Sequence, residues 1–335
     1  MAHILYIGQY TAGSTSRMRA DKFKSLLPDH QFHVINSDIP FYECNKFSRS
    51  IGFRFKVGPL ISSINNYIKC NVKELAYKLI WIDKGIFINK DTLKFLKART
   101  SKLIHYTPDT AFFQNKSFLF ESGIHYYDLL ITTKSFDKEN YLKLVNADKL
   151  IFTTQGFDKT IHKPYHSFYE KEKSIVFIGL CEPSRERILT HLLNAGLSVK
   201  LAGYGWSKFL NSNHNNLKFL GEKLVGEEYA KAISGSLFGF GALSKKFPEL
   251  HTTRTFEIPA CGTALLTEAN FETNTFFKND EAIFYKNISE LISKIKYYSC
   301  NLSELQVLTD RGYKKVMRKY EYGDLLQEIV KEIIT

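Results

Sequence analysis

The chain has 335 residues, of which 44% are hydrophobic and 24% are charged, a balance that excludes a disordered protein. Its length suits two domains of about 150 residues each, and no run approaches the roughly 18 apolar residues that a membrane-spanning helix needs. The net charge of +12 leaves open a phosphate-rich ligand, an anionic membrane, nucleic acid, or simply a soluble surface.

Short apolar runs alternate with amphipathic stretches from the first residues onward, which is the pattern of an α/β protein. Ser16 could cap the first helix, and Pro28 follows its end. The first half is predicted to contain strands near residues 3–8, 31–36, 78–83, 102–106, 128–133 and 149–153. Helices are predicted near residues 17–27, 59–76, 89–98, 118–125 and 136–145.

The alternation stops after residue 155 and restarts at residue 174, so residues 159–173 are predicted to be a linker between domains 1–158 and 174–318. The second half repeats the plan of the first. Its strands are predicted near residues 174–179, 198–203, 217–220, 236–241, 264–267 and 282–285. Its helices are predicted near residues 184–195, 226–234, 254–261, 288–298, 303–318 and 324–334.

Each half should therefore form an open parallel sheet with helices on both sides. Ligands of such sheets bind beyond the carboxyl ends of the strands, where loops and helix N-termini meet. Two such Rossmann-like domains with their carboxyl edges facing each other would leave a cleft between them as the natural site.

The most informative segment spans residues 247–262, between two apolar runs. Backbone N–H groups of Thr252, Thr253 and Arg254 at a helix N-terminus can receive a diphosphate, and the Arg254 guanidinium can add a charge-assisted fork. Glu257, about one turn further, can accept both hydroxyls of a ribose, and Glu249 on the preceding loop can accept hydroxyls of a sugar. The segment therefore suits a nucleoside diphosphate sugar.

Pro259 follows Glu257 closely within the same predicted helix. Proline is tolerated in the first turn but costs about 3 kcal/mol in a helix interior, so this helix should be short or bent. His251, just before the helix, is expected only to shape the loop.

The pair Glu249 and Glu257, followed by Ala260-Cys261-Gly262, resembles the E-x7-E motif of retaining GT-B glycosyltransferases of family 4. The stretch 254–262 is closer still to the spore-maturation CgeB-like branch of that clan. The resemblance is specific from about residue 174 to 268. It implies that Glu257 holds the ribose, that Glu249 holds the donor sugar beside its anomeric carbon, and that the final helix, in 319–335, crosses back to the first domain.

A second match lies at the start of the second domain. The run 176–179, followed by residues 183–187, resembles the first strand of the family's second domain and its phosphate-binding loop, although Leu180 stands where relatives usually carry arginine. Arg185 or Arg187 would then supply the cation, and Arg185 is preferred because it lies nearer the helix start. The Gly203-Tyr204 pair resembles the glycine-bearing strand end beside the nucleotide, although turn-forming glycines explain it equally well.

In the first domain, Gly13 and Ser14 lie between the first strand and the first helix, where the GT-B fold places the acceptor and the diphosphate. Their amides could stabilise the leaving phosphate, or the loop could be a simple capped turn. Four further polar residues are candidates for the acceptor side: Arg17, Asp83, His105 and Asp109. For His105, a buried structural histidine is the alternative.

These features predict a metal-independent glycosyltransferase that uses no cofactor beyond a UDP- or GDP-linked donor sugar, and the E-x7-E resemblance implies that the transfer retains anomeric configuration. Arg185 and Arg254 would stabilise the departing diphosphate. The aspartates show no D-x-D pair that would hold a cation. The acceptor would be a glycan or a lipid-linked or other glycoconjugate, and the resemblance implies a role in bacterial surface polysaccharide assembly.

Residues 47–56 interleave phenylalanines with basic residues. Such a loop could lie on an anionic membrane, or the segment could be a strand or loop that packs its phenylalanines inward. The same interleaving also occurs in nucleic-acid-binding proteins, so a DNA-modifying glycosyltransferase is a minor alternative and nucleic acid is not the expected partner.

Two other functional classes share this architecture: a sugar-nucleotide epimerase of the UDP-N-acetylglucosamine 2-epimerase type, and a non-catalytic nucleotide- or glycan-binding protein. The five cysteines include no Cys-x-x-Cys pair, which argues against zinc or a disulfide framework and fits a reducing compartment. The sequence enters its first strand pattern at residue 3 without a basic lead, so we expect no signal peptide. A cytoplasmic location is expected, with contact at the inner face of the membrane as an option.

Overall fold

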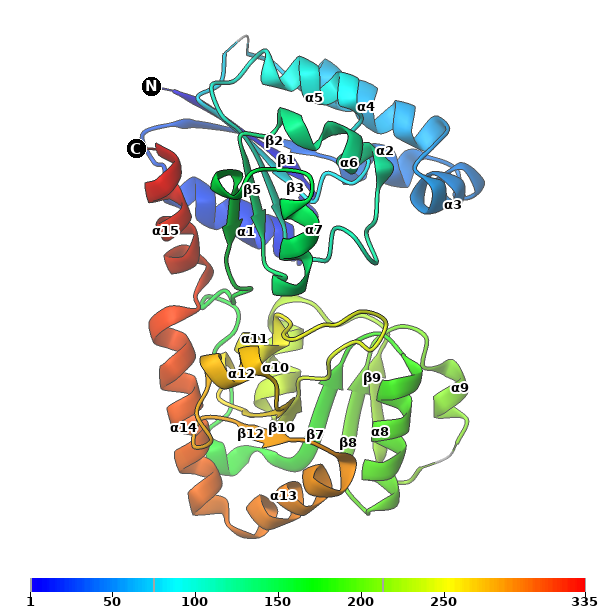
Figure 1. Ribbon diagram of the computed structural model, residues 1–335. Coiled ribbons are helices and arrows are strands. Elements are labelled where there is room, and N and C mark those ends of the chain that lie inside the picture. The colour runs from blue at the N-terminus through cyan, green and yellow to red at the C-terminus, as the bar shows by residue number, and fades with distance from the viewer. Residues whose placement is uncertain (1, 75, 213, 335) are drawn as a thin grey trace. The chain divides into compact units, whose positions relative to one another are not determined.

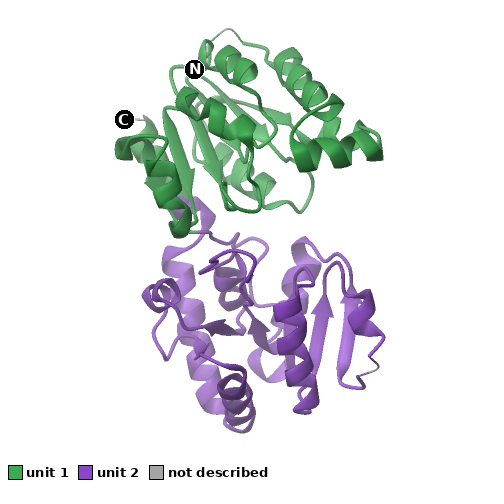
Figure 2. Ribbon diagram, turned by 45° about the vertical axis from the view of Figure 1, so that its right-hand side comes forward, with its two compact units in different colours: residues 1–154, 326–335 green, residues 155–325 purple. Residues whose placement is uncertain are grey.

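The computed structural model describes residues 2–74, 76–212 and 214–334 and contains two six-stranded sheets flanked by helices (Figure 1). All strand pairs within the two sheets are parallel, so the predicted α/β class is confirmed. The chain divides into two compact units (Figure 2). Unit 1 comprises Met1–Thr154 and Leu326–Thr335, and unit 2 comprises Gln155–Leu325.

Unit 1 contains a sheet of order β2-β1-β3-β4-β5-β6. Its strands are β1 (His3–Gly8), β2 (Gln31–Asn36), β3 (Leu79–Asp83), β4 (Leu103–Thr107), β5 (Leu129–Thr132) and β6 (Leu150–Phe152). Its helices are α1 (Thr15–Ser25), α2 (Asp38–Glu43), α3 (Lys46–Phe55), α4 (Pro59–Asn71), α5 (Lys90–Lys97), α6 (Phe118–Gly123) and α7 (Lys138–Leu142), with short 3-10 helices η1 (Ile124–Tyr126), η2 (Ser135–Asp137) and η3 (Ala147–Lys149).

The alternation of side chains along β1 builds the two cores of unit 1. Leu5 and Ile7 enter one buried cluster, which α4 and α5 complete. Ile4 and Tyr6 enter the other cluster, with side chains of α1 and the last helix, α15 (Tyr322–Ile334). Because successive residues of a strand point to opposite faces, a continuous apolar run is what a sheet covered on both faces requires.

Unit 2 contains a sheet of order β12-β11-β10-β7-β8-β9. Its strands are β7 (Glu172–Ile178), β8 (Val199–Ala202), β9 (Leu217–Gly221), β10 (Ser236–Phe240), β11 (Ala264–Glu268) and β12 (Ile283–Tyr285). Its helices are α8 (Pro183–Asn194), α9 (Ser207–Leu210), α10 (Gly226–Ser234), α11 (Arg254–Ala260), α12 (Phe271–Phe276), α13 (Ile288–Cys300) and α14 (Leu302–Lys319), with the 3-10 helix η4 (Phe168–Glu170).

The order of the unit 2 sheet defines its topological switch point. The first strand, β7, has β8 on one side and β10 on the other, so the connections that follow β7 and β10 leave the sheet in different directions. In open parallel sheets the crevice at this point, outside the carboxyl ends of the two strands, is where ligands bind. The carboxyl ends of β7 and β10 are therefore the place to look for a site.

Several local predictions differ from the structure. The first helix is capped by Ser14 and not by Ser16, because Ser14 Oγ accepts the Arg17 N–H while Ser16 lies within the helix, buried against Tyr6. The helix predicted over 59–76 ends at Asn71, and residue 75 lies outside the described residues.

The segment 47–56 is neither a strand nor a loop, since most of it is helix α3. Its Phe47, Phe53 and Phe55 side chains are exposed, so the expectation that they pack inward is wrong. Asn45 starts the helix, because its side chain accepts the Ser48 N–H. Among the described helices, none combines the length and the apolar character that crossing a bilayer requires.

The segment predicted as a linker, 159–173, packs onto unit 2. The Tyr165 and His166 backbone N–H groups donate to Ser234 Oγ at 2.8 and 3.1 Å, and the Lys171 ammonium donates to the Ser234 carbonyl. The sequence of polar residues therefore marks the start of unit 2 and not a free connection, and the division between the units falls at Gln155.

Candidate functional site

Arg254, the first residue of α11, lies at the switch point of unit 2. Its Nη1 donates to the Ile178 carbonyl at 3.4 Å and its Nη2 donates to the Ala242 carbonyl at 3.3 Å. Ile178 ends β7 and Ala242 follows β10. The guanidinium therefore joins the carboxyl ends of the two strands between which the sheet order reverses.

Arg185, in the first turn of α8, lies beside the same strand end. Its Nη1 donates to Glu182 Oε1 at 3.0 Å and to the Leu180 carbonyl at 3.1 Å, and the side chain is buried. The guanidinium carbons of Arg185 and Arg254 each lie 5.8 Å from the ring centroid of buried Phe177. Burial and the neighbouring Arg254 lower the pKa of Arg185, and Glu182 only partly offsets them.

The two arginines retain hydrogen-bonding capacity. The Nε atoms of Arg185 and Arg254 are buried and have no hydrogen-bond partner among the residues that the structure describes. Buried polar groups are nearly always paired, and two cations in one electrostatic neighbourhood repel each other. An anion with several oxygens would satisfy both Arg185 and Arg254.

The sequence left open whether Arg185 or Arg187 lies at this strand end. Arg187 is exposed on α8, so the structure brings Arg185 there.

Glu249 lies on the loop between β10 and α11, near these arginines. Its Oε2 accepts the Ser244 N–H at 2.7 Å, and the Ser244 hydroxyl donates to Glu182 Oε2 at 2.9 Å. Its charge also acts on Arg185, whose pKa it raises slightly against the effect of burial. The structure thus brings Glu249, Arg185 and Arg254 together at one edge of the sheet.

Glu257 is buried inside α11, and two side chains hold its carboxylate. Tyr229 of α10 donates from its hydroxyl to Glu257 Oε2 at 2.6 Å, and His162 Nε2 lies 3.7 Å from Oε1. Burial and Glu257 raise the pKa of Tyr229, so its hydroxyl stays a donor. His162 Nδ1 accepts the Asp158 N–H at 3.1 Å, which leaves the ring proton on Nε2, facing Glu257.

Sequence reasoning missed Tyr229 and His162. Each lies far from Glu257 along the chain, and neither forms part of a recognisable motif. A carboxylate oxygen accepts more than one hydrogen bond, so Glu257 keeps acceptor capacity in this arrangement. The Tyr229 hydroxyl fixes one oxygen of the carboxylate by a hydrogen bond, and His162 Nε2 faces the other oxygen at 3.7 Å, beyond hydrogen-bond distance.

The start of α11 differs in part from the prediction. The Thr252 N–H donates to Thr255 Oγ1 at 3.1 Å, so in this structure that amide is not offered to a ligand. Thr253 is the residue that precedes the helix, and α11 spans only seven residues, with Pro259 inside it. The expectation of a short helix is confirmed. Burial raises the pKa of Cys261, which keeps this thiol protonated and unsuited to nucleophilic chemistry.

Close backbone approach accounts for the two glycines at the ends of β7 and β8. Gly203 has a φ of +133°, and a Cβ there would lie 2.0 Å from the Gly179 carbonyl oxygen, which also accepts the Trp206 indole N–H at 2.8 Å. Tyr204, which follows, is 50% exposed. The glycine pair therefore has a structural cause, and its predicted contact with a nucleotide stays a prediction.

In unit 1 the predicted phosphate loop is a capped turn. Gly13 has a φ of +77°, and the Ser14 N–H donates to the Thr11 carbonyl at 3.2 Å. Arg17 lies 3.5 Å from Asp21. These contacts give the loop a local explanation, and its roles toward phosphate and acceptor stay predictions.

The remaining acceptor-side candidates lie at the ends of β3 and β4. Asp83 is buried and accepts two bonds from Arg19, each at 2.9 Å, so its carboxylate is already neutralised. Asp109 pairs with Lys84 at 2.7 Å, both partly exposed. His105 is buried, its Nε2 donates to the Lys84 carbonyl at 2.8 Å, and burial lowers its pKa to about 4. The structure favours the structural interpretation of His105, and acceptor contact by Asp109 stays a prediction.

Comparison with known proteins adds two findings. The model of a family described as glycosyl transferase-like matches residues 185–331, which include Arg185, Glu249, Arg254 and Glu257. Comparison with curated proteins gave no significant match.

Solved structures match the whole chain. HepE of Anabaena, in complex with UDP and glucose, is 12% identical and aligns over 99% of both chains with a TM-score of 0.65. AviGT4, a glycosyltransferase of avilamycin A biosynthesis, is 11% identical over 99% of this chain and 97% of that one, with a TM-score of 0.61. WaaB, a lipopolysaccharide outer core galactosyltransferase, is 11% identical over 98% and 99%, with a TM-score of 0.55. The chain has the GT-B fold.

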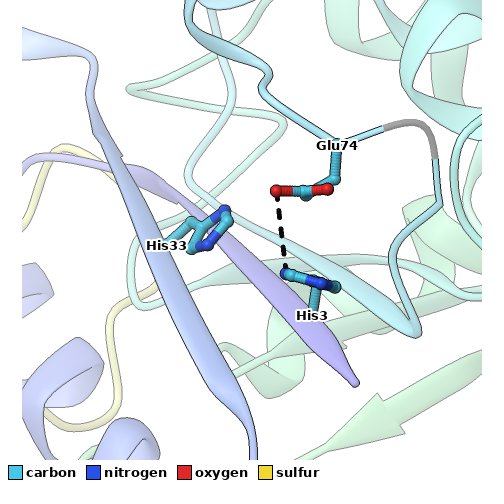
Figure 3. A group of neighbouring side chains, drawn as sticks. All are labelled: His3, His33 and Glu74. Atoms are coloured by element: carbon cyan, nitrogen blue, oxygen red, sulfur yellow. Dashed lines mark ion pairs between the residues drawn. The ribbon is translucent and has the colours of Figure 1, made fainter. Parts of the chain in front are cut away.

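A group of possible metal ligands in unit 1 lies away from the carboxyl ends of the strands, where Asp83 and Asp109 are found. The ligand atoms of His3, His33 and Glu74 lie within 4.8 Å of one another (Figure 3), and His3 Nδ1 is 3.9 Å from Glu74 Oε1. Ligands of a tetrahedral zinc ion sit at about 2.0–2.1 Å from it, which requires mutual spacings of about 3.4 Å. The group is looser than that and lies where β1 and β2 begin, away from the carboxyl ends.

Proposed function

We propose that this protein is a glycosyltransferase that moves a sugar from a nucleoside diphosphate to a hydroxyl of an acceptor. One observation carries the proposal: Arg185 and Arg254 meet at the switch point of unit 2, and the Nε atoms of both are buried without a hydrogen-bond partner among the residues that the structure describes. A diphosphate supplies the oxygens and the negative charge that this pair lacks. The match of residues 185–331 to a glycosyl transferase-like family supports the same conclusion.

In the proposed reaction the two guanidiniums stabilise the diphosphate as it leaves the anomeric carbon. Their charge takes the place of a metal ion, so we propose a metal-independent transfer. Glu257, oriented by Tyr229 and His162, accepts the ribose hydroxyls, and Glu249 accepts hydroxyls of the donor sugar. We propose retention of configuration on the basis of the E-x7-E resemblance.

We propose UDP as the nucleotide of the donor and a glycan or lipid-linked glycan as the acceptor. HepE has been solved with UDP and with UDP-glucose, which supports uridine for a chain of the same fold. The lipopolysaccharide acceptor named for WaaB supports a role in bacterial surface polysaccharide assembly. Such a transferase would work on the cytoplasmic side, where nucleotide sugars are made.

A thermal-shift screen of nucleoside diphosphates and their sugars tests this function. A ligand at 100 times its dissociation constant adds about 2.7 kcal/mol to the free energy of unfolding. We expect UDP and a UDP-sugar to raise the melting temperature of the protein, and uridine without phosphates to have little effect. If no nucleoside diphosphate changes the melting temperature, the proposed donor site is wrong.

Product analysis then separates a transferase from an epimerase. Without an acceptor, an epimerase interconverts two nucleotide sugars, whereas a transferase leaves the sugar unchanged or slowly hydrolyses it. We expect release of UDP to accelerate when a suitable acceptor glycan is added. Interconversion of sugars without UDP release would contradict the transferase assignment.

A further inference from the structure

Helix α3 of unit 1 and the residues around it carry an unusual density of exposed apolar side chains. Phe47, Phe53 and Phe55 of α3 are 76%, 51% and 57% exposed, and Val57, two residues after the helix, is 46% exposed. Tyr42 of the preceding helix α2 is 62% exposed. Single exposed apolar residues are normal on a soluble protein, but a contiguous group of them marks an interaction surface.

The fold holds this helix firmly in place, so the exposure is not that of a loose loop. A Cβ at Gly52 would lie 2.6 Å from Leu60 Cβ, which shows that α3 packs closely on α4 through this glycine. Lys56 ends the helix with a φ of 59° and donates its backbone N–H to the Gly52 carbonyl at 2.9 Å. Gly52 therefore marks the side of the helix that contacts α4, and Phe47, Phe53 and Phe55 stay exposed at other positions of a helix that is held in place.

Basic side chains accompany the aromatic ones. A groove of about 760 Å³ beside α3 is lined by ten residues, all in the described part of unit 1, and none of them is acidic. Five of the ten are cationic and three are phenylalanines. The cations are Lys46, Arg49, Arg54, Lys56 and Lys116, and the phenylalanines are Phe41, Phe53 and Phe113.

We propose that α3 and this groove dock the protein on an anionic lipid bilayer, with the phenylalanines in the headgroup region and the cations on the lipid phosphates. An interfacial helix of this kind combines apolar side chains with lysine and arginine, as α3 does. The aliphatic Val57 and Ile39, 46% and 39% exposed, favour lipid over nucleic acid, because aliphatic side chains offer no ring for bases to stack on. The proposal does not depend on the proposed glycosyl transfer.

Vesicle flotation tests this proposal directly, without a donor or an acceptor. We expect the full-length protein to float with vesicles of an equal mixture of phosphatidylcholine and phosphatidylglycerol, and not with phosphatidylcholine alone. Each basic residue near an anionic surface contributes about fivefold in affinity, so Arg49→Glu/Arg54→Glu should weaken binding at least about 25-fold. Phe47→Ser/Phe55→Ser should weaken it about tenfold or more.

Matched variants on unit 2 serve as controls. Lys314→Glu/Arg318→Glu makes the same change of net charge on α14, and Tyr169→Ser removes a ring that is 71% exposed on η4. Both should bind vesicles like the wild type, and unfolding temperatures show whether each variant is folded. Phe47, Arg54 and Phe55 are exposed and Arg49 is partly exposed, so neither pair of substitutions changes a fully buried side chain.

Three outcomes would overturn the proposal. The first is equal binding to neutral and anionic vesicles, and the second is wild-type binding by both α3 variants. The third is binding to a single-stranded oligonucleotide that is lost in the α3 variants while vesicles are ignored, which would make this a nucleic-acid surface. Failure of donor binding in the thermal-shift screen would leave the flotation result unaffected, so the two proposals fail separately.

Discussion

Replacing Arg254 with lysine tests the proposed diphosphate site while keeping the positive charge. The arginine uses Nη1 and Nη2 on the carbonyls of Ile178 and Ala242, and its fork still has donors to offer to phosphate oxygens. A lysine ammonium is a compact point charge on a flexible chain and cannot serve both strand ends and a phosphate in one position. The variant should therefore lose the geometry of the site but not its charge.

The expected magnitude follows from the number of bonds at stake. A hydrogen bond to a charged group is worth about 1.5–3 kcal/mol, which corresponds to about 10- to 150-fold in a binding constant. We expect Arg254→Lys to weaken binding of the nucleoside diphosphate within that range, measured by titration calorimetry. Arg254→Gln, which also removes the charge, should fall at or beyond the upper end.

The control is Arg187→Lys, on the exposed face of α8 near Arg185. It changes the same chemistry close to the site but should leave the affinity within about twofold, because exposed arginines contribute little. Melting temperatures without ligand show whether loss of the strand-end bonds has damaged the fold. Unchanged affinity in both Arg254 variants, or an equal loss in the control, would refute the reasoning.

Three further predictions concern other residues. Glu257→Ala should weaken donor binding about 10- to 150-fold through loss of ribose contacts, whereas Glu249→Ala should mainly lower kcat. Steady-state kinetics measures kcat and the KM of the donor for each variant. Equal changes of kcat and KM in the two variants would contradict this division of roles. Burial lowers the pKa of His105 from 6.5 to about 4, so below pH 6.5 this histidine is protonated in the unfolded chain before it is protonated in the folded protein. The free energy of unfolding should therefore fall by about 3 kcal/mol as the pH drops from about 6.5 to 4. Urea unfolding of His105→Gln should lack that component of the acid dependence. Gly203→Ala should destabilise unit 2 by more than Gly221→Ala. Both glycines have a positive φ, but only at Gly203 would the added Cβ lie 2.0 Å from a backbone carbonyl oxygen, that of Gly179. Similar melting temperatures of the two variants would count against this.

The order and type of the main elements could be predicted because each described strand carries a short apolar run, which is longest in buried strands such as β1 and β3. The predicted strands 3–8 and 31–36 have the same bounds as β1 and β2, although β2 also contains polar residues. The break near residue 155 was visible for the same reason. The prediction was wrong where one sequence pattern fits two kinds of structure. In residues 47–56 the alternation of phenylalanines and cations is typical of a strand, but most of the segment forms helix α3.

The candidate site was only partly accessible from the sequence. Glu249, Arg254 and Glu257 lie within nine residues and carry a motif, and Arg185 begins a helix just after a recognisable strand and glycine. Tyr229 has no such mark, because its contact with Glu257 depends on how α10 packs beside α11 and not on sequence spacing. Likewise, nothing in the sequence says that the Thr252 amide is already bonded to Thr255.

The two switch points differ in how their charged side chains are paired, and only that of unit 2 is proposed to bind the diphosphate. In unit 1, β1 and β3 adjoin at the reversal, and there Asp83 accepts bonds from Tyr6 at 2.8 Å and from Arg19, so the buried cation has a buried anion as its partner. In unit 2 the same place in the sheet holds two guanidiniums, and Glu182 contacts only one of them directly, at 3.0 Å. Glu182 and Glu249 lie beside these guanidiniums, but the Nε atoms of Arg185 and Arg254 have no hydrogen-bond partner among the described residues. Buried donors without a partner are costly unless a ligand supplies one. We therefore propose that the donors at β7 and β10 bind the diphosphate, whereas the pair of Arg19 and Asp83 serves the stability of unit 1.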